Sequence, residues 1–399
     1  MGISKTVRRQ MSEGSWIRRM FETGITLKEK LGEENVFDLS LGNPVTEPPP
    51  AFYDELRRLL DNPRPGMHRY MPNAGYPETR QSIAQCLSDE IGLPFSSVDI
   101  VMCVGAGGGL NVALHSLLDI GDEVVVFAPY FVEYLYYIQN HHGQPVVVPS
   151  RQGFLPDIDA LTESLTPRTK AVIVNSPNNP TGAVYDSDLL DQLGKVLHHA
   201  EQSFGTQIYL VSDEPYRKII FDGLTYPHVY HHYNRSIVVT SHSKDLGLPG
   251  ERIGYIAANP SCPGKEELID ALTFSTRSLG FVNAPALMQR VVQVLQGITV
   301  DVSEYQRKRD LLYQGLIDLG YQVHRPQGAF YMFPRSPLPQ DEARFVQLLQ
   351  EQGVLVVPGT GFGTPGYFRI SYCVPEAMLV GALKKFAIVA RQLHLEPQI

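Results

Sequence analysis

The sequence predicts an α/β protein in which a mainly parallel, seven-stranded sheet is flanked by helices and joined to a smaller α+β domain. Three observations lead to this fold class. Short β-branched runs alternate with amphipathic stretches from residue 98 to residue 258, the runs are apolar almost throughout, and the texture of the chain changes after about residue 300. Alternation of this kind is typical of a sheet with helices between its strands.

Seven apolar runs are expected to form the sheet. They span residues 98–104, 123–128, 145–149, 170–176, 207–213, 236–241 and 253–258. After the first run, apolar residues recur at helical spacing from Leu110 to Leu118, ahead of Gly121. Near-continuous apolar strands indicate a sheet covered on both faces. Because such sheets bind ligands outside the carboxyl ends of their strands, chemistry is expected at those ends.

The flanking segments predict the second domain. We expect residues 61–300 to form the large domain, and residues 1–60 to form an N-terminal arm and part of a small domain completed by residues 301–399. The small-domain elements are expected to be helices over Trp16–Leu31, 301–319 and from 375 onward, with strands at 36–41, 329–334, 354–357 and 367–373.

Composition favours small-molecule chemistry. The net charge of −8 provides no basic footprint for nucleic acid or an anionic membrane. No basic N-terminal leader with an apolar stretch and no run of roughly 18 apolar residues is present, so a cytoplasmic protein is expected. The four cysteines are far apart, and the three His-His pairs, expected on the solvated surface, lack further ligands at suitable spacing; we therefore expect reduced thiols and no metal site.

Polar motifs follow four of the expected strands. They are VGAGG (104–108), NSPNNPTG (175–182), SDEPY (212–216) and SHSKDLGLPGERIG (241–254). Taken singly each has an ordinary explanation, since Gly-rich and Asn-Pro-Gly segments form turns and an isolated lysine is usually exposed. Their common position at strand ends, in this order, indicates a shared site.

Together these motifs resemble the class I and II aminotransferases of the pyridoxal-phosphate (PLP) fold type I superfamily. The resemblance covers roughly residues 35–375 and is specific because SPNNPTG, SDEPY and S-x-S-K followed by R-x-G occur in the family's order and approximate spacing. It implies an aminotransferase that moves an amino group from an amino acid to a 2-oxo acid, with PLP as cofactor and a homodimer as the working unit.

The resemblance implies that Lys244 carries the cofactor as a Schiff base. Its amine must be partly deprotonated to attack the aldehyde, and once freed it can act as general base and acid. Asp213 matches the carboxylate that keeps the pyridine nitrogen protonated. Tyr216 and Asn179 match the residues that hydrogen-bond the phenolic oxygen. From the residues alone, Asp213 could equally be the N-cap of a following helix.

The phosphate group needs local donors in an acidic protein. A strand-to-helix turn offers free N–H groups and a favourable helix dipole. The residues expected to hold the phosphate are Gly105, Ala106, Gly107, Ser241 and Arg252, the last two by resemblance to the family.

Two aromatic residues complete the expected cofactor site. Phe131 matches the ring that stacks on the cofactor, although the adjacent Tyr130 could take this place. Both could also belong to an aromatic helix face in the core. Tyr70 matches a tyrosine that reaches the phosphate of the neighbouring subunit, which is why the resemblance implies shared active sites.

Substrate binding requires a partner for the α-carboxylate. Arginine suits this role because its planar donors pair bidentately. Arg369 in GYFRISY matches the family's arginine, assisted by Asn179 and the backbone at Gly42, and closure of the small domain would bring it into place. Outside the resemblance, a strand arginine in a small domain is more often a surface residue.

Arg277 has two interpretations. In dicarboxylate-specific relatives a basic residue of the partner subunit, a few positions before an Asn-x-Pro element, pairs with the distal carboxylate, and Arg277 stands six residues before Asn283. Alternatively it is a surface or interface arginine whose stem packs on Phe274 or Phe281.

One departure and two alternatives remain at this point. Gly107 stands where one bacterial subgroup of aspartate aminotransferases has a lysine for the distal carboxylate, which argues against aspartate specificity by that route. A β-lyase of the same fold would use the same lysine and aspartate. A non-catalytic regulator usually has a fused DNA-binding segment, and we find neither room before residue 35 nor a basic patch for one.

Overall fold

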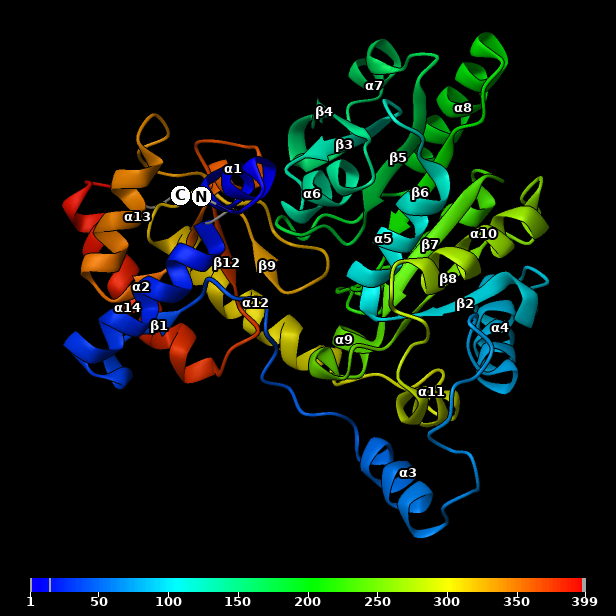
Figure 1. Cartoon of the computed structure of the whole chain (residues 1–399). Coiled ribbons are helices and arrows are strands. Elements are labelled where there is room, and N and C mark those ends of the chain that lie inside the picture. The colour runs from blue at the N-terminus through cyan, green and yellow to red at the C-terminus, as the bar shows by residue number, and fades with distance from the viewer. Residues whose placement is uncertain (1, 14–15, 397–399) are drawn as a thin grey trace.

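The computed structural model describes residues 2–13 and 16–396. Figure 1 shows a large sheet with helices on both faces and, beside it, a smaller unit in which blue N-terminal and orange-red C-terminal segments lie together. The predicted fold class, PLP fold type I with a seven-stranded, mainly parallel sheet and a smaller α+β part, is confirmed.

The large sheet has the strand order β2-β8-β7-β6-β5-β3-β4. Its strands are β2 (Ile100–Cys103), β3 (Glu123–Ala128), β4 (Gln144–Pro149), β5 (Thr169–Asn175), β6 (Tyr209–Asp213), β7 (Ser236–Ser241) and β8 (Gly254–Ala258). Neighbouring strands run parallel except that β8 is antiparallel to both β7 and β2. The carboxyl ends of β5, β6 and β7 therefore meet at one edge.

Two cores cover the two faces of this sheet. In β3, Val125 and Phe127 enter one core while Val124 and Val126 enter the other, as the two-residue period of a strand requires. The first core is shared with α4 (Pro77–Ile91), α7 (Ile158–Ser164), α8 (Ser187–Phe204) and α11 (Ala286–Gln293), the second with α5 (Gly105–Leu117), α6 (Glu133–Asn140) and α10 (Lys265–Ser278).

The smaller unit joins both ends of the chain. Its core contains Met20 and Leu39 from the N-terminal part together with Phe386 from the last helix. The elements are α2 (Trp16–Leu31), β1 (Phe37–Asp38) paired parallel to β10 (Val354–Leu355), the antiparallel set β11 (Val357–Pro358), β12 (Phe368–Ser371) and β9 (Tyr331–Met332), and α12 (Val302–Asp318), α13 (Glu342–Glu351) and α14 (Glu376–Gln392).

In the described part of residues 1–61, two helices were not among the expected elements. The helix α1 (Lys5–Glu13) reaches α6, where Gln10 Nε2 donates to Gln139 Oε1 at 3.2 Å. The helix α3 (Pro50–Asp61) projects away from the sheet in Figure 1.

The histidine pairs need one correction. Contrary to the expectation of a solvated surface, His141 is buried, and its Nε2 lies 3.1 Å from Asn111 Oδ1 on α5. Among the described residues, no helix combines the length and apolar character needed to cross a membrane.

Candidate active site

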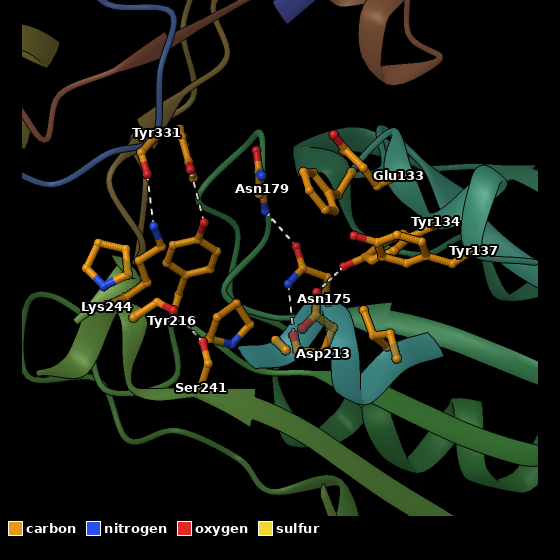
Figure 2. Close-up of a pocket in the computed structure, with 18 of the residues that line it drawn as sticks. Glu133, Tyr134, Tyr137, Asn175, Asn179, Asp213, Tyr216, Ser241, Lys244 and Tyr331 are labelled. Carbon is orange, nitrogen blue, oxygen red and sulfur yellow. Dashed lines mark hydrogen bonds between the residues drawn. The ribbon is translucent and has the colours of Figure 1, made fainter. Parts of the chain in front are cut away.

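A cavity of about 350 Å³ opens at the carboxyl ends of β5, β6 and β7. Its walls come from these strand ends, from the first turns of α5 and α6, and from the small unit. Figure 2 shows side chains from both units converging on it. This is the edge of the sheet where the strand-end motifs predict chemistry.

Lys244 lies in the short helix α9 (His242–Asp245), directly after β7. Its Nζ donates to the backbone oxygen of Gly42 at 2.9 Å. Withdrawal from water lowers the pKa of Lys244 to about 8, and the positive charges of Arg252 and Arg369 act in the same direction. A substantial fraction of this amine is therefore neutral, and so nucleophilic, near physiological pH.

Asp213 ends β6 at the floor of the cavity. Tyr134 donates to its Oδ2 at 2.5 Å, and Asn175 Nδ2 donates to its backbone oxygen at 2.8 Å. Burial raises the pKa of Asp213 to about 7, although the hydrogen bond from Tyr134 lowers it. Its Oδ1 is buried and has no hydrogen-bond partner. Since no helix begins after Asp213, it is not an N-cap; its Oδ1 is an acceptor without a donor.

Tyr216 follows β6 and faces the small unit. Its hydroxyl lies 3.0 Å from that of Tyr331, from β9 (Figure 2), and burial raises its pKa well above the ordinary value. Gly42 packs directly against Tyr331. A Cβ at position 42 would lie 1.9 Å from the Tyr331 hydroxyl. A residue with a side chain at position 42 would displace Tyr331.

The opposite end of the cavity is electropositive. α5 begins at Gly105, whose φ is +67° and whose added Cβ would lie 2.7 Å from Arg252 Nη2. Glycine is thus required both by conformation and by the close approach of the guanidinium. Ala106, Gly107 and Ser241 line the cavity beside Arg252. Gly105 does not line the cavity but packs against the guanidinium of Arg252. A helix N-terminus next to an arginine suits an anion.

Arg369 in β12 is buried at the small-unit side of the cavity. Its Nη1 donates to Asn179 Oδ1 at 3.0 Å and its Nη2 to the backbone oxygen of Ser40 at 2.6 Å. Its guanidinium carbon is 4.7 Å from the ring centroids of both Tyr331 and Phe362. Arg369 is therefore not a surface residue, and its buried Nε has no partner.

The aromatic stretch after β3 contributes Phe131 and not Tyr130. The Tyr130 amide donates to the Phe362 oxygen at 3.1 Å, and its ring packs at Gly363. Phe131, Tyr134 and Tyr137, three residues apart, line the cavity. Tyr130 and Phe131 precede α6, so they do not belong to a helix face; Tyr134 and Tyr137 do belong to α6, and their face borders the cavity.

Besides Gly105, two expected site residues lie outside the cavity of their own chain. Tyr70 is 88% exposed. Arg277 is exposed on α10, with its guanidinium carbon 5.4 Å from the centroid of Phe274, the contact expected of a structural arginine. A role for either in a partner's site stays a prediction.

Several lining residues were not predicted. Asn175 and Ser243 stand inside the quoted motifs, and Tyr134 and Tyr137 follow Phe131 at helical spacing, so a signal for these existed. Glu133 had no such signal, and neither did Tyr331, which reaches the site only through the fold of the small unit.

The chain matches known proteins over most of its length. The family model described as aminotransferase class I and II matches residues 34–386. A curated relative, the aspartate/prephenate aminotransferase of Thermus thermophilus, is 36% identical over 361 residues, covering 88% of this chain and 90% of that protein.

Solved structures agree with this match. An amino transferase from Eubacterium rectale has a TM-score of 0.95 at 37% identity, covering 98% of this chain and 99% of that one. The aspartate aminotransferase from Thermus thermophilus with maleate has a TM-score of 0.86 at 31% identity, covering 98% of this chain and 100% of that one.

Proposed function

The chain belongs to the class I and II aminotransferases and is an aminotransferase, and we propose that it transfers amino groups between amino acids and 2-oxo acids with pyridoxal 5′-phosphate on Lys244. The observation that supports this assignment best is the pairing, in one cavity, of a lysine with a pKa of about 8 and a buried aspartate whose free oxygen lacks a donor.

The cavity fits this cofactor. The unpartnered Oδ1 of Asp213 offers an acceptor for a protonated pyridine nitrogen, and Arg252 with the start of α5 offers donors for a phosphate. Phe131 gives a ring face, while Tyr216 and Asn179 offer donors for a phenolic oxygen. When bound, PLP supplies an aldehyde that condenses with amines and a ring that withdraws electrons from the substrate Cα.

Side chains of the cavity then supply proton transfer and substrate binding. Lys244, once free, would take the proton from the substrate Cα and deliver it to the aldehyde carbon of the cofactor, because its lowered pKa suits both steps. Arg369 binds the α-carboxylate, with Asn179 and the backbone oxygen of Ser40 holding the fork in place. Burial of this arginine strengthens the pairing by excluding water.

We further propose a cytoplasmic homodimer with shared active sites. The exposed Tyr70 supports this, because a large aromatic side chain without cover is suited to contact a second copy. In the dimer Tyr70 would reach the phosphate region of the partner's cavity.

Borohydride reduction of the purified holoenzyme, followed by peptide mapping, tests the assignment of Lys244. We expect the cofactor on the peptide that contains Lys244, and Lys244→Ala should lose transfer by roughly 10²–10⁴-fold. The control is Lys218→Ala, a lysine 3.6 Å from Asp245 outside the cavity, which should keep the label. A label on another lysine refutes the assignment.

Product analysis separates transfer from a β-lyase reaction. We expect a 2-oxo acid acceptor such as 2-oxoglutarate or pyruvate to gain the amino group in proportion to donor consumed. Release of ammonia and pyruvate from a donor with a Cβ leaving group, without transfer, would favour the β-lyase.

A further inference from the structure

One charged residue of the cavity has no role in the proposed function. Three basic side chains line it, and in the proposed function Lys244 carries the cofactor, Arg252 faces the phosphate and Arg369 binds the α-carboxylate. Asp213 faces the pyridine nitrogen. Among the described lining residues this leaves no cation for a second substrate carboxylate, and it leaves one carboxylate, Glu133, without a role.

Glu133 is the first residue of α6, two positions after Phe131. Figure 2 places it on the same side of the cavity as Tyr134 and Tyr137, across from Lys244 and Tyr331. It therefore lines the cavity on the side opposite Lys244.

One oxygen of the half-buried Glu133 carboxylate is an acceptor without a donor. This oxygen, Oε2, is shielded from solvent and has no hydrogen-bond partner. Burial raises the pKa of Glu133, while a hydrogen bond from its own backbone N–H and the charge of Arg369 oppose the shift. A buried acceptor of this kind is stabilised by a ligand that brings a donor.

Resting on the proposed function, we propose that Glu133 sets the substrate class, favouring amino acids whose side chains end in an N–H donor and disfavouring dicarboxylates. An amide, ammonium, guanidinium or imidazole group supplies the missing donor. A distal carboxylate instead meets a like charge in a poorly solvated space. Sites with such a polar group discriminate strongly between substrates of nearly equal shape.

Isosteric donor pairs test this without changing substrate size. The half-reaction of the holoenzyme, followed by cofactor absorbance, gives kcat/KM for glutamine against glutamate and for asparagine against aspartate. We expect the wild type to prefer the amide in at least one pair, and Glu133→Gln to shift that amide-to-acid ratio toward the acid by about tenfold or more. Glu133→Ala, measured in parallel, should shift it in the same direction.

Three further measurements distinguish a failure of the proposed function from a failure of the role proposed for Glu133. Alanine, which carries no distal group, reports transfer itself: if neither alanine nor any other amino acid converts the cofactor, the proposed function fails. If amino acids react but the ratios are unchanged in both Glu133 variants, only the role of Glu133 is refuted. Arg277→Ala should leave the ratios unchanged; a selective loss of the dicarboxylates would show that a partner-supplied cation reads them and would overturn the inference.

Discussion

The two walls of the cavity are built in different ways. On the sheet wall, Asn175 and Asp213 are register partners in adjacent strands, and Asp213 is in turn the partner of Val239. Their positions are fixed by a continuous backbone ladder. On the small-unit wall, Gly42, Tyr331 and Arg369 come from distant parts of the chain and rest on a separate core.

Side-chain hydrogen bonds join these walls across the cavity. They run from Lys244 to Gly42 at 2.9 Å, from Arg369 to Asn179 at 3.0 Å, and between the hydroxyls of Tyr216 and Tyr331 at 3.0 Å. Such bonds can be exchanged for bonds to a substrate, whereas a strand ladder cannot. The difference leads us to propose that the sheet wall mainly holds the cofactor, whereas the small-unit wall binds the substrate together with Asn179 and Glu133 from the large unit.

Asp213→Asn should have the largest effect on kcat of the variants that probe this contrast. We expect kcat to fall by roughly 10²–10³-fold because the amide no longer provides a charge for the pyridine nitrogen. Substrate KM should change little, since Arg369 is on the other wall. Steady-state kinetics decide; near-normal turnover would remove Asp213 from the site.

The same variant also has a stability signature in the cofactor-free protein. Burial raises the pKa of Asp213 to about 7, above its value in the unfolded chain, so the folded protein loses stability as pH rises through the interval up to about 7. Asp213→Asn removes this loss. Thermal unfolding should show a larger gain for the variant at pH 8 than at pH 5, because pH 5 lies inside this interval and pH 8 lies above it.

Arg369→Ala should affect the substrate wall alone. We expect all amino acid and oxo-acid substrates to weaken alike, by roughly 2–5 kcal/mol, or about thirty-fold to a few thousand-fold in kcat/KM. Cofactor retention, measured by dialysis and absorbance, should match the wild type. A loss confined to one substrate would mean that Arg369 reads a side chain.

Tyr134→Phe should have the smallest effect, because Tyr134 positions Asp213 and does not contact the reacting atoms. Its hydrogen bond lowers the pKa of Asp213, so its removal raises that pKa and moves the acid limb of the kcat profile to higher pH. We expect a loss of roughly tenfold near the acid limb. Tyr137→Phe is the matched control on the same helix face; an equal shift there would exclude a specific role for Tyr134.

Local pattern was sufficient for much of the fold and for the sheet wall. Apolar runs located the seven strands within a few residues, and the strand-end motifs located Asp213, Asn179 and Lys244 because parallel strands bring their carboxyl ends together. Periodicity says nothing about strand direction, so the reversal of β8 was not predicted. Only the structure decided that the Phe131 ring, and not the Tyr130 ring, lines the cavity, because Tyr130 is held by Phe362 and Gly363.

The sequence by itself determined which residue types stand at the strand ends, because a strand and the turn after it are specified by adjacent residues. Only the tertiary structure decided which side chains from distant segments meet them. Tyr331 is set against Gly42 and Tyr216 by the packing of the small unit, and Glu133 lines the cavity with an unpartnered Oε2 only because of where α6 begins. Partnership and burial depend on contacts between remote parts of the chain, and a local pattern does not contain them.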